Sequence, residues 1–376
     1  MQIQDFALER YFAGREHTAR HLLGSSDIEG MGLAELLALA EPDGERRWRE
    51  LTLGYTESAG LPALREEIAG LYEHVAPDGI LVLSGAEEAI FLTAHALLRA
   101  GDHVVCPWPA YQSLHEAARA AGADVTLLRL RHEECWRLDP DAVRRALRPA
   151  TRLIVVNAPH NPTGATIGAN DLDALAGMAE EAGAVLLSDE VYRLMEHDPA
   201  DRLPPAADRS RSALSIGVMS KAFGLAGLRI GWVASRDPGV IRSIARLHDY
   251  TTICASAPSE LLALIALRAR EAVLERGRAI VHANLPLVEA FMAGHAEALE
   301  WAPPRGGCVG FPRLVDGGSA DDLAERLLRE EGTLVTPGSL FGDLPEHVRI
   351  GFGRRDLEPA LAALARVLAR WPSAAA

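Results

Sequence analysis

Lysine is almost absent from this sequence: of 38 basic residues, 37 are arginine and only Lys221 is a lysine. A GC-rich genome favours arginine codons and explains the 37, but it does not explain the exception. A guanidinium group neither loses its proton near neutral pH nor condenses with an aldehyde, whereas a primary amine does both. The residues around Lys221 must therefore decide whether this amine has a chemical role.

Other scarcities exclude whole classes of protein. No stretch approaches the roughly 18 apolar residues that a membrane helix needs, and the N-terminus lacks the basic and then apolar layout of a signal peptide. We therefore expect a cytoplasmic protein with no membrane partner. The four cysteines form no CxxC pair, so we expect neither a disulfide framework nor a metal site. The net charge of −14 and the lack of a basic stripe argue against a nucleic-acid partner.

Periodicity predicts an α/β fold. Short runs rich in Val, Ile and Leu alternate with helical segments between residues 80 and 235, which is typical of a mostly parallel sheet with helices on both faces. Seven strands are predicted, at Ile80–Leu83, His103–Cys106, Asp124–Leu130, Leu153–Asn157, Ala184–Ser188, Leu214–Val218 and Arg229–Ala234. After Pro258 the pattern changes to a helical stretch ending near His295, short strand-like pieces, and a last helix from Leu357 to about Arg370.

These patterns predict a large domain and a smaller α+β domain built from the N- and C-terminal segments. We expect an N-terminal segment at 1–50 that packs on the small domain, a large ligand-binding domain at 51–257, and an interdomain helix with the C-terminal small domain at 258–376. The N-terminal segment contains Gly24-Ser25-Ser26 and a predicted helix at Leu33–Leu39.

Polar segments follow four of the predicted strands, where ligands gather in open α/β sheets. After the first strand, Ser84-Gly-Ala-Glu-Glu88 opens a predicted helix whose free N–H groups could bind a phosphate. The alternative is that Ser84 is an ordinary helix cap. The other segments are Asn157-Ala-Pro-His-Asn161-Pro-Thr-Gly164, Asp189-Glu-Val-Tyr192 and Ser220-Lys221-Ala-Phe-Gly-Leu-Ala-Gly-Leu-Arg229-Ile-Gly231. Each segment alone also fits an ordinary cap or turn. The glycines after Lys221 do not have dinucleotide-binding spacing, and they lead into a strand instead of a helix.

Taken together, NPTG, DEVY and SKAFGLAGLRIG in this order and spacing resemble the aspartate aminotransferase superfamily, the fold-type-I enzymes that use pyridoxal 5′-phosphate (PLP), in the class I/II branch. The resemblance extends from about Leu51 to Arg370. It implies that PLP is the cofactor, that an amino acid is the substrate, and that the working unit is a homodimer with shared active sites.

The resemblance also implies roles for individual residues. Lys221 would form a Schiff base with PLP and move protons at the substrate Cα, and Asp189 would pair with the pyridine nitrogen. Tyr192 would act with them and, like Asn161, hydrogen-bond the phenolate oxygen of the ring, while Tyr111 would stack on its face. The remaining cofactor contacts implied are Gly85, Ala86, Glu87, Ser220 and Arg229, with Tyr55 reaching the phosphate of the neighbouring subunit.

The implied substrate site centres on Arg349, whose planar fork suits a carboxylate, with Gly24 and Ser25 beside it. Side-chain specificity is expected from positions such as Ser25, Ser26, Tyr111 and Thr252. The sequence departs from the family at Val218, three residues before the lysine, where a Ser or Thr normally gives the phosphate a hydroxyl.

Two reactions fit this resemblance. Transfer of the amino group to a 2-oxo acid is the commoner one in the branch. The alternative is elimination, cyclisation or replacement in a biosynthetic pathway, because residues 24–29 and 248–252 are similar to the capreomycidine synthase subgroup, which cyclises a hydroxylated arginine. A third class, an effector-binding domain fused to a DNA-binding domain, is disfavoured because the first 50 residues lack the periodic apolar sequence of a winged helix.

Overall fold

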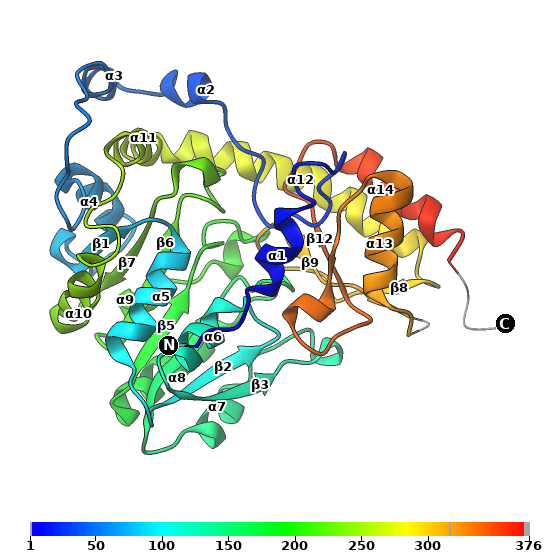
Figure 1. Cartoon of the computed structure of the whole chain (residues 1–376), viewed down its shortest axis with the longest axis horizontal. Coiled ribbons are helices and arrows are strands. Elements are labelled where there is room, and N and C mark those ends of the chain that lie inside the picture. The colour runs from blue at the N-terminus through cyan, green and yellow to red at the C-terminus, as the bar shows by residue number, and fades with distance from the viewer. Residues whose placement is uncertain (1, 316, 372–376) are drawn as a thin grey trace.

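The computed structural model describes residues 2–315 and 317–371, and its centre is a seven-stranded sheet (Figure 1). The strand order is β1-β7-β6-β5-β4-β2-β3, and β7 is antiparallel to both of its neighbours while the other pairs are parallel. The strands are β1 (Ile80–Leu83), β2 (His103–Trp108), β3 (Asp124–Arg129), β4 (Thr151–Asn157), β5 (Val185–Asp189), β6 (Ala213–Val218) and β7 (Gly231–Ser235). The predicted α/β fold class is confirmed.

Helices cover both faces of this sheet because its strands are apolar on both sides. Along β4, Leu153 and Val155 join the core shared with α5 (Ala86–Leu97), α6 (Ser113–Ala120) and α10 (Pro238–His248). The alternate residues Ile154 and Val156 join a second core with α7 (Pro140–Ala146) and α8 (Ala169–Ala182). A strand buried on both faces reads as a continuous apolar run, which is why the prediction located it.

Six of the seven predicted strands differ from the observed ones by one or two residues at an end, and an expected helix cap also differs. The strand predicted from Arg229 begins at Gly231, because Arg229 has φ +53° and ends the short 3₁₀ helix η4 (Ala226–Leu228). Ser84 does not cap α5. Its backbone N–H donates to Glu88 Oε2 at 2.7 Å, and the N-cap is Gly85, with φ +94°. This positive φ favours glycine at residue 85, and the absence of a side chain there leaves room for the Arg229 guanidinium, whose Nη2 would lie 2.9 Å from a Cβ.

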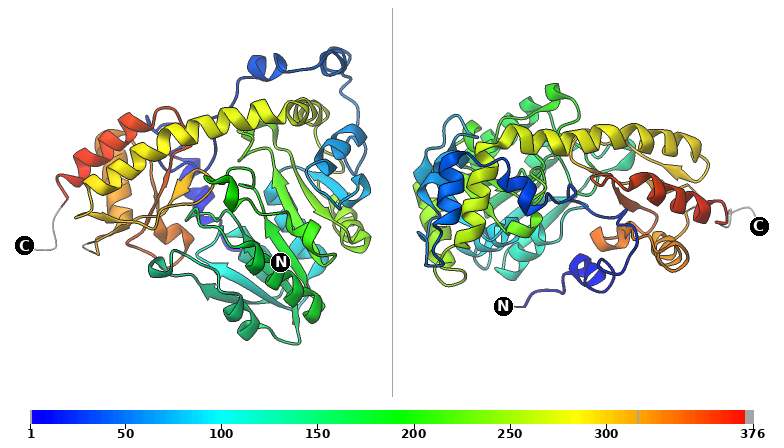
Figure 2. Two further views of the ribbon diagram at one scale, coloured as in Figure 1. Left: turned by 180° about the vertical axis from the view of Figure 1, so that it is seen from behind. Right: turned by 90° about the horizontal axis from the view of Figure 1, so that it is seen from above.

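The smaller α+β unit follows two helices, α11 (Ala257–Arg268) and α12 (Arg270–Gly294), and Figures 1 and 2 show α12 running toward it along one side of the molecule. A three-stranded antiparallel sheet has the order β11-β12-β9, and a pair β10-β8 lies beside it. The elements are β8 (Leu299–Glu300), β9 (Val309–Gly310), β10 (Arg313–Leu314), α13 (Ala320–Glu331), β11 (Thr336–Pro337), β12 (Val348–Gly351) and α14 (Leu357–Leu368).

The N-terminal segment makes two sets of contacts. Residues 20–29 run beside the small-domain strands, where Gly24 N–H donates to Leu334 O at 2.6 Å and Glu29 N–H donates to Gly353 O at 2.8 Å. The helices α2 (Leu33–Leu37) and α3 (Pro42–Arg49) instead lie against α11, far from α13 and α14 in Figure 1. Helix α4 (Pro62–Ala69) then leads into β1. The domain boundaries at 50 and 257 stay a prediction.

None of the helices within residues 2–315 and 317–371 is long and apolar enough to cross a lipid bilayer.

Candidate active site

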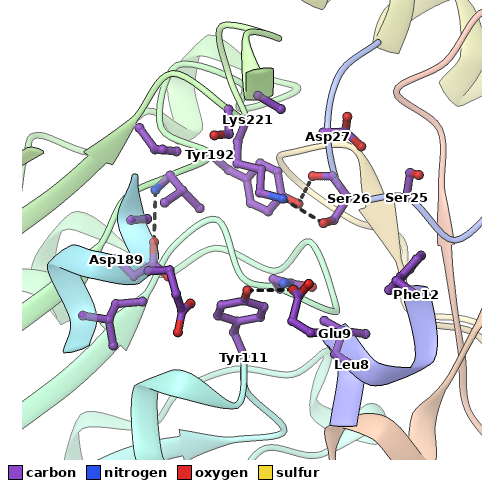
Figure 3. Close-up of a pocket in the computed structure, with 18 of the residues that line it drawn as sticks. Leu8, Glu9, Phe12, Ser25, Ser26, Asp27, Tyr111, Asp189, Tyr192 and Lys221 are labelled. Atoms are coloured by element: carbon purple, nitrogen blue, oxygen red, sulfur yellow. Dashed lines mark hydrogen bonds between the residues drawn. The ribbon is translucent and has the colours of Figure 1, made fainter. Parts of the chain in front are cut away.

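A cavity of about 350 Å³ lies beyond the carboxyl ends of the strands, between the large sheet, the small domain and the helix α1 (Ala7–Ala13) (Figure 3). The sequence predicted twelve of the residues that line it as catalytic, cofactor-binding, substrate-binding or specificity residues: Ser25, Ser26, Ala86, Glu87, Tyr111, Asn161, Asp189, Tyr192, Ser220, Lys221, Arg229 and Arg349. The fold thus brings to one place side chains that are up to 324 positions apart in the sequence. Val218, where the family carries a hydroxyl, lines the same cavity.

Lys221 follows β6 and extends its amine into the cavity. Its Nζ donates to Ser26 Oγ at 2.9 Å. Burial lowers the pKa of the amine, because removing water penalises the ammonium form, and the charge of Asp27 opposes that shift. A lowered pKa increases the fraction of unprotonated amine, which is the form that attacks a carbonyl carbon or removes a proton.

Asp189 ends β5 and is 3% exposed. Its Oδ1 accepts from Val191 N–H at 3.2 Å, and Asn157 Nδ2 donates to its backbone carbonyl at 3.0 Å. Burial raises the pKa of this carboxyl to about 6, while its bond to Val191 and the charge of Lys221 act in the other direction. Within residues 2–315 and 317–371, no cationic side chain hydrogen-bonds the Asp189 carboxylate, so a protonated ring nitrogen would suit it.

The start of α5 and the loop after β6 form an anion-binding corner. Gly85 presents backbone next to Arg229, and Arg229 Nη1 donates to Ser220 Oγ at 3.4 Å. Gly231 packs directly on Gly85, since a side chain at residue 231 would come within 2.6 Å of the Gly85 carbonyl carbon. The dipole of α5, the Arg229 guanidinium and the Ser220 hydroxyl together give the chemistry that a phosphate group requires.

Arg349 lies on β12 and is 1% exposed. Its Nη1 donates to Asn161 Oδ1 at 3.0 Å, and its Nη2 donates to the backbone carbonyl of Gly24 at 2.7 Å. Its Nε has no hydrogen-bond partner within the part of the chain that the structure describes. A buried guanidinium without a carboxylate partner is costly unless an anion completes it, which fits the predicted carboxylate site.

Tyr111 and Tyr192 close the cavity from two sides. The Tyr192 hydroxyl donates to the Ser26 carbonyl, and burial raises its pKa well above the ordinary value. The Tyr111 hydroxyl faces Glu9 Oε1 at 3.4 Å, as Figure 3 shows, and its ring packs against Phe6 with centroids 5.2 Å apart.

Sequence reasoning missed the contribution of α1, which lines the cavity with Leu8, Glu9, Phe12 and the following Glu16. Glu9 and Glu16 join Glu87 to form what we call the acidic wall. Burial raises the pKa of Glu87 to about 7, and the charge of Glu9 acts in the same direction. Glu87 Oε2 is buried and has no hydrogen-bond partner among the described residues.

Other predicted residues lie outside the cavity lining. Gly24 contributes only its backbone carbonyl to Arg349, and Gly85 lies behind Arg229. Tyr55 is 87% exposed in the single chain, so its expected role across subunits stays a prediction. Thr252, expected to contribute to specificity, donates to Glu88 and is not among the cavity-lining residues.

Comparisons with known proteins give a consistent result. Residues 23–364 match the family described as aminotransferase class I and II. The chain is 35% identical to the capreomycidine synthase of Streptomyces vinaceus over 97% of its own length and 93% of that protein. A PLP-dependent aminotransferase from Streptococcus suis superimposes with a TM-score of 0.93 at 31% identity, over 99% of this chain and 100% of that one. The PLP-dependent cyclase OrfR gives a TM-score of 0.90 at 32% identity, over 98% of both chains.

Proposed function

The chain belongs to the aminotransferase class I and II family of PLP-dependent enzymes, and from this premise we propose that it uses PLP to act at the Cα of an amino acid and transfers the amino group to a 2-oxo acid. The observation that carries the proposal is one cavity lined by a buried amine, a buried carboxylate and a buried guanidinium, those of Lys221, Asp189 and Arg349.

The residues present fit PLP group by group. The Lys221 amine can hold the aldehyde, and the buried Asp189 carboxylate can pair with the pyridine nitrogen. Ala86, Ser220 and Arg229, with Gly85 behind them, suit the phosphate, and the Tyr111 ring suits one face of the pyridine. Because Asn161 Oδ1 accepts from Arg349, its Nδ2 is left to donate to an oxygen of the cofactor, as is expected of the Tyr192 hydroxyl.

When bound, PLP supplies an electron-withdrawing ring that stabilises negative charge at Cα. The protein's own residues then control the proton. Lys221 removes it from Cα and returns it, Arg349 fixes the substrate carboxylate, and Asp189 keeps a positive charge on the ring nitrogen by remaining ionised beside it. Tyr111 and α1 cover the cavity and limit the access of water to the reacting atom.

A second candidate reaction is cyclisation of an amino acid with a cationic side chain, and the acidic wall favours it. Glu9, Glu16 and Glu87 line the cavity around Tyr111, and an acidic surface would repel the second carboxylate of aspartate while attracting a guanidinium or ammonium group. The similarity to capreomycidine synthase over nearly the whole chain supports the same alternative.

We also propose that the enzyme is a homodimer with shared active sites. Two segments linked by the hydrogen bond from Ser58 Oγ to Asp249 Oδ1 at 2.9 Å carry large exposed apolar side chains in the single chain. Leu53 and Tyr55 are 85% and 87% exposed, and Tyr250 and Ile253 are 87% and 51% exposed. Such a concentration of exposed apolar groups supports a contact with a second copy.

The test is a panel of amino acids that includes aspartate, leucine and arginine derivatives, assayed with and without a 2-oxo acid. Amino transfer requires the acceptor and yields one new 2-oxo acid per turnover. Cyclisation needs no acceptor, and its product keeps all the nitrogen of the substrate. Absence of both products, and of exchange of the Cα hydrogen with deuterated water, for every amino acid would contradict the proposal. Lys221→Ala is the control for background reaction.

A further inference from the structure

Ser26 lies between the two side chains expected to act at the reacting atom. Its hydroxyl accepts from Lys221 Nζ at 2.9 Å, and its backbone carbonyl accepts from the Tyr192 hydroxyl. Figure 3 shows all three groups converging on the cavity, with Ser26 entering from the side opposite the large sheet. The sequence predicts only a contribution of Ser26 to side-chain specificity, and the family resemblance gives it no role at the Lys221 amine.

The chain around Ser26 is fixed to the small domain. The Gly24 carbonyl accepts from Thr336 Oγ1 at 3.0 Å and from Arg349 Nη2 at 2.7 Å. On the other side, Asp27 pairs with Arg354 at 3.2 Å. Ser26 is therefore held from both directions, and the same segment that supports the expected carboxylate anchor presents a hydroxyl to the expected base.

We propose that Ser26 is a positioning residue that aims the Lys221 amine at the substrate Cα. This inference rests on the proposed function, because it concerns the proton transfer assigned there to Lys221. A lysine amine sits on a flexible four-carbon stem, so a fixed acceptor narrows the orientations it samples. When one N–H donates to Ser26 Oγ, the lone pair stays free. In the step, the Cα–H bond breaks, the proton joins that lone pair, and the bonding electrons remain on Cα.

The hydrogen bond between Lys221 and Ser26 joins two parts of the fold. Lys221 belongs to the loop after β6, whereas the segment that carries Ser26 is bound to β11 and β12 through the hydrogen bonds of the Gly24 carbonyl. A substrate carboxylate bound to Arg349 would therefore stabilise the segment that orients the base. A serine that served packing alone would not connect the anchor to the amine in this way.

The single lysine of the chain gives an unusually direct test. Lysine labelled with ¹³C at Cε yields one side-chain signal, from Lys221, and its pH titration in the full chain without cofactor reports the amine alone. We compare wild type with Ser26→Ala, Ser26→Thr and the exposed small-domain control Ser339→Ala. Asp27, Asp189, Arg349 and Cys308 also act on this amine, and they are unchanged in all four proteins.

We expect Ser26→Ala to lower the Lys221 titration midpoint by about half a pH unit or more, because a hydroxyl acceptor stabilises the ammonium form. With cofactor bound, kcat should fall about tenfold while KM stays within about twofold. A lower midpoint alone would leave more free base at neutral pH, so the fall in kcat reports lost orientation. Ser26→Thr should restore both values, and Ser339→Ala should change neither.

Three outcomes would overturn the inference: an unchanged midpoint, an unchanged kcat, or a rise in KM alone. Thermal unfolding and cofactor content are measured for each protein, and Ser26→Cys, which preserves volume but accepts weakly, replaces Ser26→Ala if the latter does not fold. Failure of the proposed function gives a different result, since wild type itself would then form neither product and would not exchange the Cα hydrogen with deuterated water.

Discussion

Replacing Asp189 by asparagine should stabilise the cofactor-free protein at neutral pH. Burial raises the pKa of this carboxyl from 3.8 to about 6, and the side chain is 3% exposed. Between these two values the unfolded chain ionises while the folded chain holds its proton, so the stability of the wild type falls as pH rises. This difference in pKa between the two states corresponds to about 3 kcal/mol of unfolding free energy, fully developed above pH 7.

Asparagine does not titrate, and its Oδ1 can still accept from Val191 N–H. Denaturant unfolding of wild type and Asp189→Asn, run in parallel without cofactor between pH 4.5 and 8, should therefore diverge by about 2 kcal/mol as pH rises, because about 1 kcal/mol of the difference is already present at pH 4.5. The exposed Asp343→Asn serves as control. Curves that stay parallel across this range would mean that Asp189 does not carry the raised pKa.

With cofactor bound, the same substitution should have the opposite consequence. The ionised carboxylate would then have a cationic ring nitrogen beside it, and losing that pairing should reduce kcat by roughly a thousandfold or more, which corresponds to several kcal/mol in the barrier. An Asp189→Asn enzyme with full PLP content and near wild-type kcat would refute the assignment of the electron-withdrawing role to this pairing.

Four further outcomes are expected. Lys221→Ala should abolish covalent PLP, and borohydride reduction with peptide mapping of the wild type should place the pyridoxyl group on Lys221 and nowhere else. Arg349→Ala should leave cofactor attachment intact but lower kcat/KM by about tenfold to a hundredfold through KM, as steady-state kinetics would show, because a charged hydrogen bond to the substrate is lost. Sedimentation should give a dimer at assay concentration, and an active monomer would contradict both the dimer and the role of Tyr55. For a cationic substrate, KM should fall as pH rises through about 7, where Glu87 becomes charged. Glu87→Gln should remove this pH dependence of KM. A pH-independent KM in the wild type would rule out a contact between Glu87 and the substrate cation.

The strands could be predicted because each is a short buried run of apolar residues between polar or glycine-rich segments, a pattern that is visible in the local sequence. Ile80–Leu83 is bounded in the structure as the sequence predicts, since all four residues are buried and the flanking segments are polar or rich in glycine. β2 runs two residues further than predicted, to Trp108, because its carbonyl accepts from Leu130 N–H at 2.7 Å. That contact depends on a neighbour 22 positions away, and no local pattern contains it.

The expected catalytic residues could also be predicted from the order of residues along the chain. Asp189 ends β5 and Lys221 lies three residues after the end of β6. The carboxyl ends of these neighbouring parallel strands meet at one edge of the sheet, so order along the chain predicts proximity in space. The resemblance of the motifs to a PLP-dependent family added the identity of the cofactor, and the family match confirms it. Local order could not predict the cap of α5, which lies at Gly85, with φ +94°, instead of at Ser84.

The acidic wall lies beyond the reach of local sequence patterns because α1 owes its position to distant contacts. It has only seven residues, too few to be stable alone, and no side chain caps its start. Its place is set by Gln112, which accepts from Ala7 N–H at 2.9 Å and donates to the Asp5 carbonyl at 2.9 Å, and by the packing of Phe6 on Tyr111. These contacts span more than 100 positions, yet they place Glu9 beside the ring expected to cover the cofactor. The groups that would hold the cofactor are therefore attached to the large sheet. A group that would select the substrate side chain, Glu9, is instead attached to α1, a short helix that packs over the cavity. Substitutions in α1 can therefore change substrate specificity without displacing the residues that act on Cα.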